Sequence, residues 1–566
     1  MTIISFENFT FKYNGVKSPT LKNINLNIEK GEKILIAGPS GSGKSTLAHC
    51  INGLIPFSYK GVIDGELTIN GLKPYRESIH EISKHVGTIL QDQDGQFVGL
   101  SVGEDVAFIY ENNKVAQKDM FNGVIKALEA VNMNDYIDET PYNLSGGQKQ
   151  RVSMAGILAS DAEILLFDEP LANLDPVSGN RAMELIDEIH RRTNKTIIII
   201  EHRIEDVLEH NIDRMVIIDE GEIIANSSPD ELLSTNSITR SGLREPLYVE
   251  ALKKLKVKIG KLDKISKIEN AIKYSENMKK LSLTKKDIKE KEDKEIILQL
   301  EGVYYRYFKD SENIIKNISF NINKKETLII LGNNGAGKST LLKVISGIAR
   351  NNKGKMYYKG QDITDWTVRK RAHIIGYAMQ NPNHMITQNI VCDEVAFGPR
   401  NFGMDKDTIG DRVNETLRIC GLYEYRNWPI SALSYGQKKR LTIASILVMK
   451  PEIIILDEPT AGQDYRNYKE FMTFLDRIKK GGTSIIIITH DMQLALEYGD
   501  RGLVLCQGEI IKEDSIYNIL SDNEVIKKAN LKETSLTKLA RICGINNIGS
   551  FVSQFIRKEK VGVVNE

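Results

Sequence analysis

Each half of this 566-residue chain contains a glycine-rich segment with the spacing of a phosphate-binding loop. In such loops the glycines let backbone N–H groups converge on phosphate oxygens, a lysine reaches the β- and γ-phosphates, and the next hydroxyl ligates Mg²⁺. The first loop comprises Gly38, Pro39, Ser40, Gly41, Ser42, Gly43, Lys44, Ser45 and Thr46, and the second comprises Gly332, Asn333, Asn334, Gly335, Ala336, Gly337, Lys338, Ser339 and Thr340. We therefore predict two nucleotide sites on one chain.

Paired carboxylates follow an apolar run in each half, downstream of the loop. Asp168 and Glu169 end one run, and Asp457 and Glu458 end the other. A buried strand delivers the first carboxylate of each pair to the Mg²⁺ shell and leaves the second facing the γ-phosphate, where it polarises the attacking water. We expect these glutamates to be catalytic.

A serine and glycines open a predicted helix ahead of each carboxylate pair. The first copy reads Ser145, Gly146, Gly147 and Gln148. The backbone N–H groups and positive dipole at such a helix start form an anion-binding surface. Because each half already has one phosphate loop, we expect this surface to serve another nucleotide.

The elements that must position these residues are short strands alternating with helices. Apolar runs at 33–37 and 327–331 precede the two loops, which gives the strand, loop and helix order that the motif requires. β-Branched strands alternating with helical stretches predict an α/β fold with mixed parallel and antiparallel sheets. The motifs recur in the same order at a nearly constant separation, so we interpret the chain as a duplicated domain.

The predicted boundaries give two domains, each with a small helical appendage. They are an ATPase domain at 1–236, an appendage and Lys-rich linker at 237–295, a second ATPase domain at 296–520 and a C-terminal helical appendage at 521–566. Residues 251–295 contain fifteen lysines against eight acidic residues, which is typical of a solvated helical linker. A basic surface for anionic lipid or nucleic acid is the alternative.

Composition narrows the class of protein. The net charge is only +1, and the five cysteines form no C-x-x-C pair, which argues against a metal cluster or a disulfide framework. The apolar runs are far shorter than the roughly 20 residues that span a bilayer, and the first residues lack the layout of a signal peptide. We expect a cytoplasmic chain that sits on a membrane partner.

With these motifs in place, the chain resembles the ATP-binding cassette (ABC) proteins, with both cassettes fused. The resemblance implies two P-loop domains in tandem, each with a mixed-sheet core, a helical signature subdomain and a small C-terminal helical appendage. In that family the cassettes dimerise head to tail, so that each ATP lies between the phosphate loop of one half and the signature of the other. The cofactors implied are ATP and Mg²⁺.

The resemblance also implies roles for further residues. Tyr13 and Tyr307 would stack on adenine, and His202 and His490 would contact the γ-phosphate and orient the water. Asp175 and Asp464 would lie in loops at the dimer interface. The Mg²⁺ ligands implied are Ser45, Gln91 and Asp168 in the first half and Ser339, Gln380 and Asp457 in the second, and the two glutamines would also sense the membrane partner.

The second signature departs from the pattern. It reads Ser434, Tyr435, Gly436 and Gln437, with a tyrosine where glycine allows close approach of the backbone. Both glutamates and both histidines are retained, so we predict two hydrolytic sites that differ in geometry.

Within the family, one segment points to a subfamily. Residues 86–97 resemble a pattern of energy-coupling factor transporters, which import vitamins and transition metals, and the segments Glu104–Phe108 and Glu394–Gly398 add to the resemblance. Two alternatives are a ribosome-associated tandem-cassette translation factor and the fused ATPase of a carbohydrate importer. A DNA-repair ATPase would need a long coiled-coil or zinc insertion, which the sequence lacks.

The function expected is that of an importer motor at the cytoplasmic face of the membrane. ATP hydrolysis would drive uptake of a vitamin or metal ion through separate membrane subunits, one coupling and one substrate-binding. A nucleic-acid partner is not expected. The solute itself cannot be inferred, because the motor does not contact it.

Overall fold

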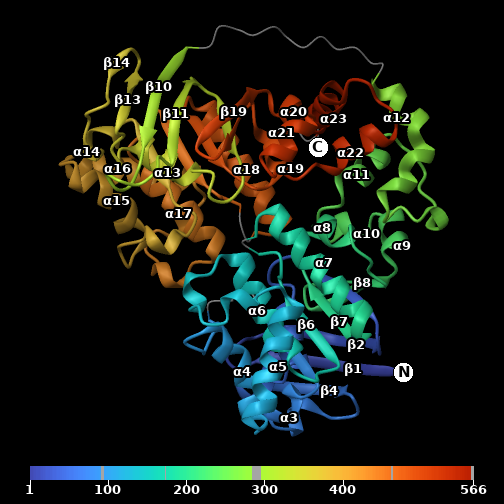
Figure 1. Ribbon diagram of the computed structural model, residues 1–566. Coiled ribbons are helices and arrows are strands. Elements are labelled where there is room, and N and C mark those ends of the chain that lie inside the picture. Colours follow the sequence, from blue (N-terminus) through green and yellow to red (C-terminus); the bar gives the residue numbers. More distant parts are fainter. Residues whose placement is uncertain (91–94, 173, 283–294, 461–462, 563–566) are drawn as a thin grey trace. The chain divides into compact units, whose positions relative to one another are not determined.

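The computed structural model describes residues 1–566 except 91–94, 173, 283–294, 461–462 and 563–566 (Figure 1). The chain forms two compact units. The first unit comprises Met1–Tyr274 with Asp464–Arg466, and the second comprises Ser275–Gln463 with Asn467–Glu566.

The first unit contains nine strands and a series of short and long helices among its described residues. Its strands are β1 (Thr2–Tyr13), β2 (Leu21–Glu29), β3 (Lys33–Ala37), β4 (Gly61–Ile69), β5 (Val86–Ile89), β6 (Ile164–Asp168), β7 (Thr196–Ile200), β8 (Arg214–Asp219) and β9 (Glu222–Ser227). Its α-helices are α1 (Lys44–Ile51), α2 (Leu54–Phe57), α3 (Ile79–Ser83), α4 (Val102–Asn112), α5 (Gln117–Ala130), α6 (Gly146–Leu158), α7 (Pro176–Thr193), α8 (Ile204–Leu208), α9 (Pro229–Ser234), α10 (Ser237–Arg240) and α11 (Leu247–Lys254).

The second unit repeats this order of elements. Its strands are β10 (Ile296–Tyr305), β11 (Ile315–Asn323), β12 (Thr327–Leu331), β13 (Lys353–Tyr358), β14 (Gln361–Asp362), β15 (Ile375–Ala378), β16 (Ile453–Asp457), β17 (Ser484–Ile488), β18 (Arg501–Cys506) and β19 (Glu509–Asp514). Its α-helices are α12 (Ser275–Ser282), α13 (Lys338–Ser346), α14 (Val368–Arg371), α15 (Val391–Asn401), α16 (Lys406–Ile419), α17 (Tyr435–Leu447), α18 (Tyr465–Lys480), α19 (Met492–Tyr498), α20 (Ile516–Ile519), α21 (Asn523–Lys528), α22 (Ser535–Ile542) and α23 (Ile548–Gly562).

Both units are built on the same pair of sheets. The six-stranded sheets have the orders β5-β6-β7-β3-β8-β9 and β15-β16-β17-β12-β18-β19, in which only the last strand is antiparallel. A three-stranded antiparallel sheet, β2-β1-β4, accompanies the first, and a four-stranded one, β11-β10-β13-β14, accompanies the second. The prediction of a duplicated α/β fold with mixed sheets is confirmed.

The central strands are apolar because both of their faces are covered. Every residue of β3, β6 and β7 is buried, and the same holds for β12 and β17. Parallel strands with helices on both sides read as continuous runs of Ile, Leu and Val rather than as alternating patterns. The isoleucine-rich strands β7 and β17 therefore belong to the core.

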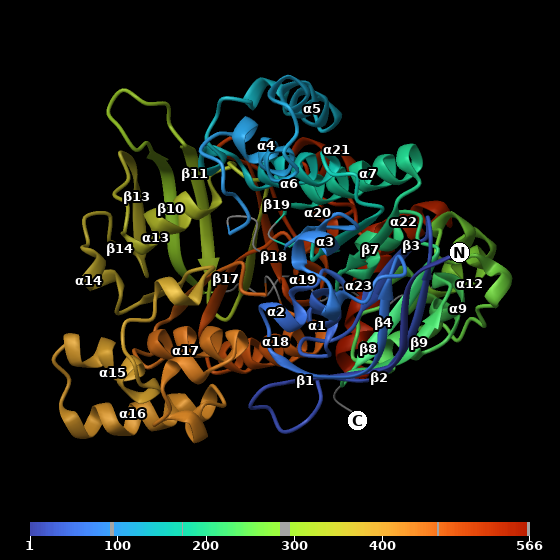
Figure 2. The same cartoon turned by 90° about the horizontal axis from the view of Figure 1, so that it is seen from below.

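Each unit also has a helical part and a C-terminal helical segment. Helices α4, α5 and α6 pack together in the first unit, and α15, α16 and α17 do so in the second, where Figure 2 shows them side by side. In the second unit α23 packs against α20 and α22. The helical signature part and the C-terminal helices were both expected from the sequence.

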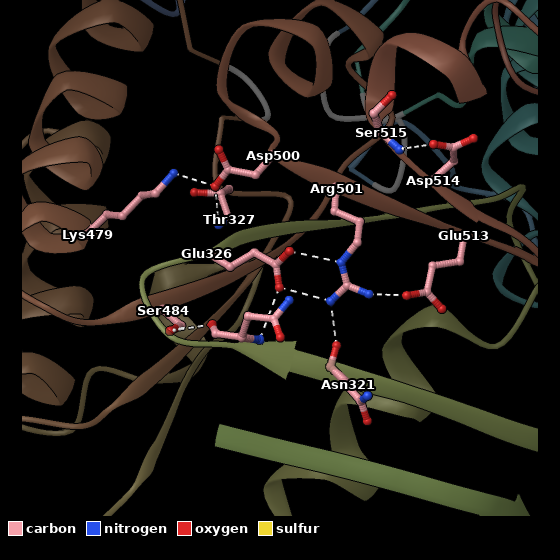
Figure 3. A network of polar contacts seen from close by, with 11 residues as sticks. Asn321, Glu326, Thr327, Lys479, Ser484, Asp500, Arg501, Glu513, Asp514 and Ser515 are labelled. Carbon is pink, nitrogen blue, oxygen red and sulfur yellow. Dashed lines mark hydrogen bonds and ion pairs between the residues drawn. The ribbon is translucent and has the colours of Figure 1, made fainter. Parts of the chain in front are cut away.

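A half-buried arginine joins the two sheets of the second unit (Figure 3). Arg501, at the start of β18, donates from Nε and Nη2 to the two carboxylate oxygens of Glu326, at 2.9 Å each, and from Nη2 to the carbonyl of Asn321 in β11 at 2.5 Å. Its Nη1 pairs with Glu513 in β19. A bidentate guanidinium–carboxylate pair fixes geometry as well as charge, so it sets the angle between the sheets.

The first unit has the same contact, which we call the arginine staple in both units. Arg214 donates to the carboxylate oxygens of Glu32 at 2.6 and 2.7 Å and to the carbonyl of Asn27 at 2.6 Å. The duplicated staple holds the antiparallel sheet of each unit against the strand that leads into its phosphate loop.

Candidate nucleotide-hydrolysis sites

The two phosphate loops have matching backbone conformations. Gly43 and Gly337 stand directly before α1 and α13 with φ of 106° and 99°, a region that side chains rarely adopt. A Cβ atom on Gly43 would also lie 2.9 Å from Cδ2 of Leu21. Glycine is therefore required at this position for the loop to turn into its helix.

The loop lysines lie over the centre of their own loops. Nζ of Lys44 donates to the carbonyls of Gly38 and Pro39 at 2.8 Å each. Nζ of Lys338 does the same with Gly332 and Asn333, at 2.7 and 2.8 Å. Burial lowers the pKa of Lys44, and the nearby Glu169 and Asp168 carboxylates oppose that effect. Each ammonium group is thus held where a bound phosphate would meet it.

The aspartates at the ends of β6 and β16 lie beside these lysines. Burial and the neighbouring Glu169 raise the pKa of Asp168 to about 6, while Lys44 opposes the shift. Burial also raises the pKa of Asp457, which accepts a hydrogen bond from Ser339. The structure therefore brings together two of the predicted Mg²⁺ ligands of the second half.

This donor set suits Mg²⁺ bound together with phosphate. Among the described residues no group of three or more His, Cys, Asp and Glu side chains could hold a metal ion by itself. Mg²⁺ favours oxygen ligands and commonly takes one or two carboxylates plus substrate phosphates. Crowded, buried carboxylates such as Asp168 and Glu169 gain from a cation, so the residues present fit the expected ion.

The two catalytic glutamates that the sequence predicts share an unusual backbone conformation. Glu169 has φ of 50° and Glu458 has φ of 47°. Their N–H groups donate to the carbonyls of Ile200 and Ile488, at 2.9 and 3.0 Å, which fixes each glutamate beside the end of the next strand. Left-handed backbone at a non-glycine residue costs of order 1–3 kcal/mol and clusters at functional sites. Its presence at both positions supports a role in catalysis.

Each glutamate faces the histidine that was predicted to orient the water. Nδ1 of His202 lies 3.7 Å from Oε1 of Glu169, and Nε2 of His490 lies 3.5 Å from Oε1 of Glu458. The electrostatics differ between the units. Burial would raise the pKa of Glu169, but the hydrogen bond to His202 lowers it on balance. Burial and the adjacent Asp457 instead raise the pKa of Glu458 to about 8.

Both signature serines cap their helices. Ser145 and Gln148 form a capping box at the start of α6, and Ser434 and Gln437 form the same box at the start of α17. Tyr435 is the first residue of α17, and its side chain is 44% exposed. The tyrosine therefore leaves the local helix start unchanged and alters only the surface beside it.

A polar side chain from each signature helix donates to the residue after the predicted catalytic glutamate, a contact that the sequence did not predict. Nε2 of Gln150 donates to the carbonyl of Pro170 at 2.6 Å, and Nζ of Lys439 donates to that of Pro459 at 2.9 Å. Burial lowers the pKa of Lys439 to about 8, against the opposing charge of Glu458. The two units thus use a neutral and an ionisable group for one structural task.

The tyrosines predicted to stack on adenine are tied to the phosphate loops. The hydroxyl of Tyr13 lies 3.1 Å from Oγ1 of Thr46, and that of Tyr307 lies 3.3 Å from Oγ1 of Thr340. The ring of Phe11, a near neighbour in sequence, is fully buried and packs edge-on against Tyr13. Stacking of Tyr13 and Tyr307 on the base stays a prediction.

The remaining predicted residues are the two glutamines and the two aspartates of the predicted interface loops. Gln380 is exposed and lies two residues after the end of β15, whereas Gln91 lies outside the described residues. Asp175 is the N-cap of α7, where its Oδ1 accepts from the N–H groups of Val177 and Ser178 at 3.1 and 3.0 Å. Asp464 stands directly before α18.

In each unit, an acidic residue holds the loop that follows the predicted Mg²⁺-ligating glutamine. That residue lies on α4 in the first unit and on α15 in the second. Asp105 accepts from the N–H groups of Val98 and Gly99, at 2.8 and 3.1 Å. Glu394 accepts from those of Thr387 and Gln388, at 2.8 Å each. The sequence showed these acids as part of the segments Glu104–Phe108 and Glu394–Gly398, but it did not show their structural role.

Two family models match the chain. The family described as "ABC transporter" matches residues 21–172 and 315–461, which contain the phosphate loops, signatures and carboxylate pairs. The family described as "ATP-binding cassette cobalt transporter" matches residues 235–305, between the two other matches.

Relatives of similar length cover almost the whole chain. A protein of Bacillus cereus with the provisional description of ABC transporter ATP-binding protein is 51% identical over 96% of this chain and 96% of its own length. Similarly described proteins of Clostridium perfringens and Vibrio vulnificus are 49% and 46% identical over 98% of this chain and 98% and 97% of their own lengths. A solved structure described as cbiO1 from Clostridium perfringens, part of the ABC transporter complex cbiONQ, aligns with 44% of this chain and 99% of its own, at 35% identity and a TM-score of 0.39.

Proposed function

Because the chain belongs to the ATP-binding proteins of ABC transporters, we propose that it is the motor of an importer of the energy-coupling factor type. The chain is an ATPase that binds ATP, uses Mg²⁺ and works with membrane components of a transporter. We further propose that the transporter works in the direction of uptake. Its cargo is a vitamin or a transition-metal ion.

The match of residues 235–305 carries this proposal. That segment lies outside the two cassette matches, and its family is described as a cobalt transporter component. General ATPase chemistry would not require a segment of this kind between the two cassettes. The segments around Glu104–Phe108 and Glu394–Gly398, which resemble those of energy-coupling factor ATPases, support the same conclusion.

We assign the hydrolytic roles to the residues whose geometry recurs in both units. Lys44 and Lys338 hold the β- and γ-phosphates, and Glu169 and Glu458 polarise the attacking water. His202 and His490 lie beside these glutamates and orient the water. Mg²⁺, held by Asp168 and Asp457 with the loop serines, would neutralise charge that develops on the phosphates.

Exposed aromatic residues support a protein partner on the helical part of each unit. Phe108 on α4 is 45% exposed, and Phe397 on α15 is 40% exposed, at matching positions after the loop-anchoring acids Asp105 and Glu394. Among the described residues no helix is long and apolar enough to cross a bilayer. We therefore infer that separate integral subunits, one for coupling and one for substrate, complete the transporter.

In this proposal ATP binding and hydrolysis move the motor between two states. A ligand shifts such an equilibrium only by as much as its affinity differs between the states. In each unit, the loop held by Asp105 or Glu394 lies between the predicted Mg²⁺-ligating glutamine and the helix that carries the exposed phenylalanine. A rearrangement at the nucleotide can therefore reach the partner surface through a short stretch of chain.

Purification from detergent-solubilised native membranes tests the proposal. A tagged chain should retain integral membrane subunits, and the double variant Phe108→Ser/Phe397→Ser should lose them while keeping its ATPase activity without partners. Leu262→Ser, at a side chain that is 94% exposed elsewhere in the first unit, serves as the control and should retain them. Co-migration with ribosomes after detergent treatment, without membrane subunits, would contradict the proposal and favour a translation factor.

A further inference from the structure

A carboxylate with no predicted role lies next to His202. Glu201 directly follows β7, and it is 0% exposed. Its Oε1 accepts from the N–H groups of His202 and Arg203, at 2.9 and 3.1 Å, and its Oε2 accepts from that of Leu171 at 3.2 Å. A buried carboxylate is stable only when it is paired or hydrogen-bonded, and these three donors supply that need.

These bonds connect the two loops that carry the proposed catalytic pair. Leu171 comes two residues after Glu169, whereas Arg203 directly follows His202. Arg203 completes the connection, because its Nη1 donates to the carbonyl of Leu171 at 3.1 Å. The N–H and the C=O of one residue are thus both held by the loop that contains His202.

Glu201 also approaches the imidazole itself. Its Oε1 lies 3.4 Å from Nδ1 of His202, the same nitrogen that lies 3.7 Å from Oε1 of Glu169. The ring nitrogen therefore lies between two carboxylates. Arg203 is engaged by Asp206, at 2.5 Å, and by the carbonyl of Leu171, so its guanidinium is bound to both loops.

The second unit has different residues at these positions. Thr489 precedes His490, and its Oγ1 accepts from the N–H of Asp491 at 3.0 Å. Asp491 caps α19 by accepting from Gln493 and Leu494, at 2.9 and 3.0 Å. Both side chains are therefore used within their own loop, whereas Glu201 and Arg203 reach the loop of Glu169.

We infer that Glu201 is a positioning residue of the first ATPase site, which holds His202 and the loop after Glu169 in register for hydrolysis. The inference rests on the roles proposed above for Glu169 and His202. Glu201 does not contact the nucleotide in this scheme. Its Oε1 holds the imidazole of His202 in one orientation through Nδ1. Its hydrogen bonds also hold the backbone of the two loops that lie on either side of the reacting water. Misplacing catalytic groups by about 1 Å can cost roughly a hundredfold in rate. Loss of Glu201 should therefore lower the rate of turnover rather than the affinity for nucleotide.

Steady-state ATPase assays on the full chain carrying Glu458→Gln, which leaves turnover to the first site, test the inference through kcat and KM separately. Glu201→Ala should lower kcat at the first site by tenfold or more, approaching the residual rate of Glu169→Gln, with KM for MgATP unchanged within about twofold. Glu201→Gln keeps one oxygen that can accept from His202 and Arg203, so it should restore part of kcat. Glu201→Thr introduces the residue of the second unit and should resemble Glu201→Ala, which keeps the test valid if the alanine variant does not fold.

Matched variants separate the possible failures. Thr489→Ala, made in a chain whose first site is silenced by Glu169→Gln, removes only a bond within its own loop and should change the remaining kcat by less than twofold. If Glu169→Gln and His202→Ala leave kcat unchanged, the proposed site roles are wrong. If those two variants lower kcat while all Glu201 variants keep the wild-type rate, or change KM alone, Glu201 has no positioning role and the site roles survive.

Discussion

The two proposed hydrolysis sites have similar backbone conformations but different charges around the glutamate to which we assign catalysis. In the first unit the histidine lies between Glu169 and Glu201, and the pKa of Glu169 is lowered. In the second unit Oε1 of Glu458 is buried without a hydrogen-bond partner among the described residues, and the pKa of Glu458 is raised to about 8. Strand order, left-handed glutamates, helix caps and arginine staples are all retained. After duplication, therefore, the fold was constrained more strictly than the electrostatics.

The largest effect is expected from removing both catalytic carboxylates. Loss of a general base typically costs 10² to 10⁴ in rate, or about 3 to 5 kcal/mol, so Glu169→Gln and Glu458→Gln should each slow hydrolysis and together abolish it. ATP binding should persist, because neither change removes a phosphate contact. Phosphate release and equilibrium binding of labelled ATP measure the two quantities. Equal residual rates in the two single variants would remove the functional difference between the sites, and wild-type turnover in the double variant would refute the assignment.

A smaller effect is expected from exchanging Gln150 and Lys439. These are the neutral and the ionisable side chain that donate to the carbonyl after each glutamate. Lys439 is 5% exposed, and its pKa falls from the ordinary 10.5 to about 8. The unfolded chain then binds more protons between pH 8 and 10.5, so the stability of the second unit should rise with pH across that window. Lys439→Gln, which copies Gln150, should remove this dependence and stabilise the unit at pH 7 by about 1 to 3 kcal/mol.

Urea unfolding at pH 7 and pH 9.5 measures this difference. Gln150→Lys is the reciprocal variant and should destabilise the first unit at pH 7 by a similar amount. A Lys439→Gln chain that is less stable than wild type at pH 7 would show that the charged form is favoured in the folded unit.

The smallest effect is expected at the second signature. Nζ of Lys439 lies 5.1 Å from the ring centre of Tyr435, a cation–π contact worth roughly 0.5 to 1 kcal/mol at an exposed site. Tyr435→Gly should therefore shift the unfolding midpoint by only a few degrees and leave the ATPase rate within about twofold. Thermal unfolding and steady-state assays decide the matter. A large fall in rate would mean that the tyrosine contributes to hydrolysis directly.

Local motifs were the part of the molecule that the sequence could predict. The phosphate loops, the strands that end in Asp168 and Asp457, and the capping serines Ser145 and Ser434 depend on neighbouring residues, and the structure places them as expected. The repeat of these motifs was enough to predict two similar α/β units.

Contacts across loops were beyond such a prediction. In the sequence, Glu201 is marked only by its position beside a histidine. Its buried carboxylate accepts a hydrogen bond from Leu171, which is 30 positions away in the chain. Likewise, the left-handed conformation of Glu169 depends on the carbonyl of Ile200 in a neighbouring strand. The exchange of Gln150 for Lys439 was visible in the sequence, but its significance depends on the burial of both side chains.

The arginine staple bears on how the protein is made. In the first unit its three members, Asn27, Glu32 and Arg214, have all been synthesised once the ribosome reaches residue 214, long before the second staple exists. Domains generally fold as units, N-terminal first, during synthesis. The first unit can therefore lock its two sheets together while the other half is still being translated. That order reduces the chance that strands of the two similarly arranged units pair with each other, a hazard that a duplicated chain faces.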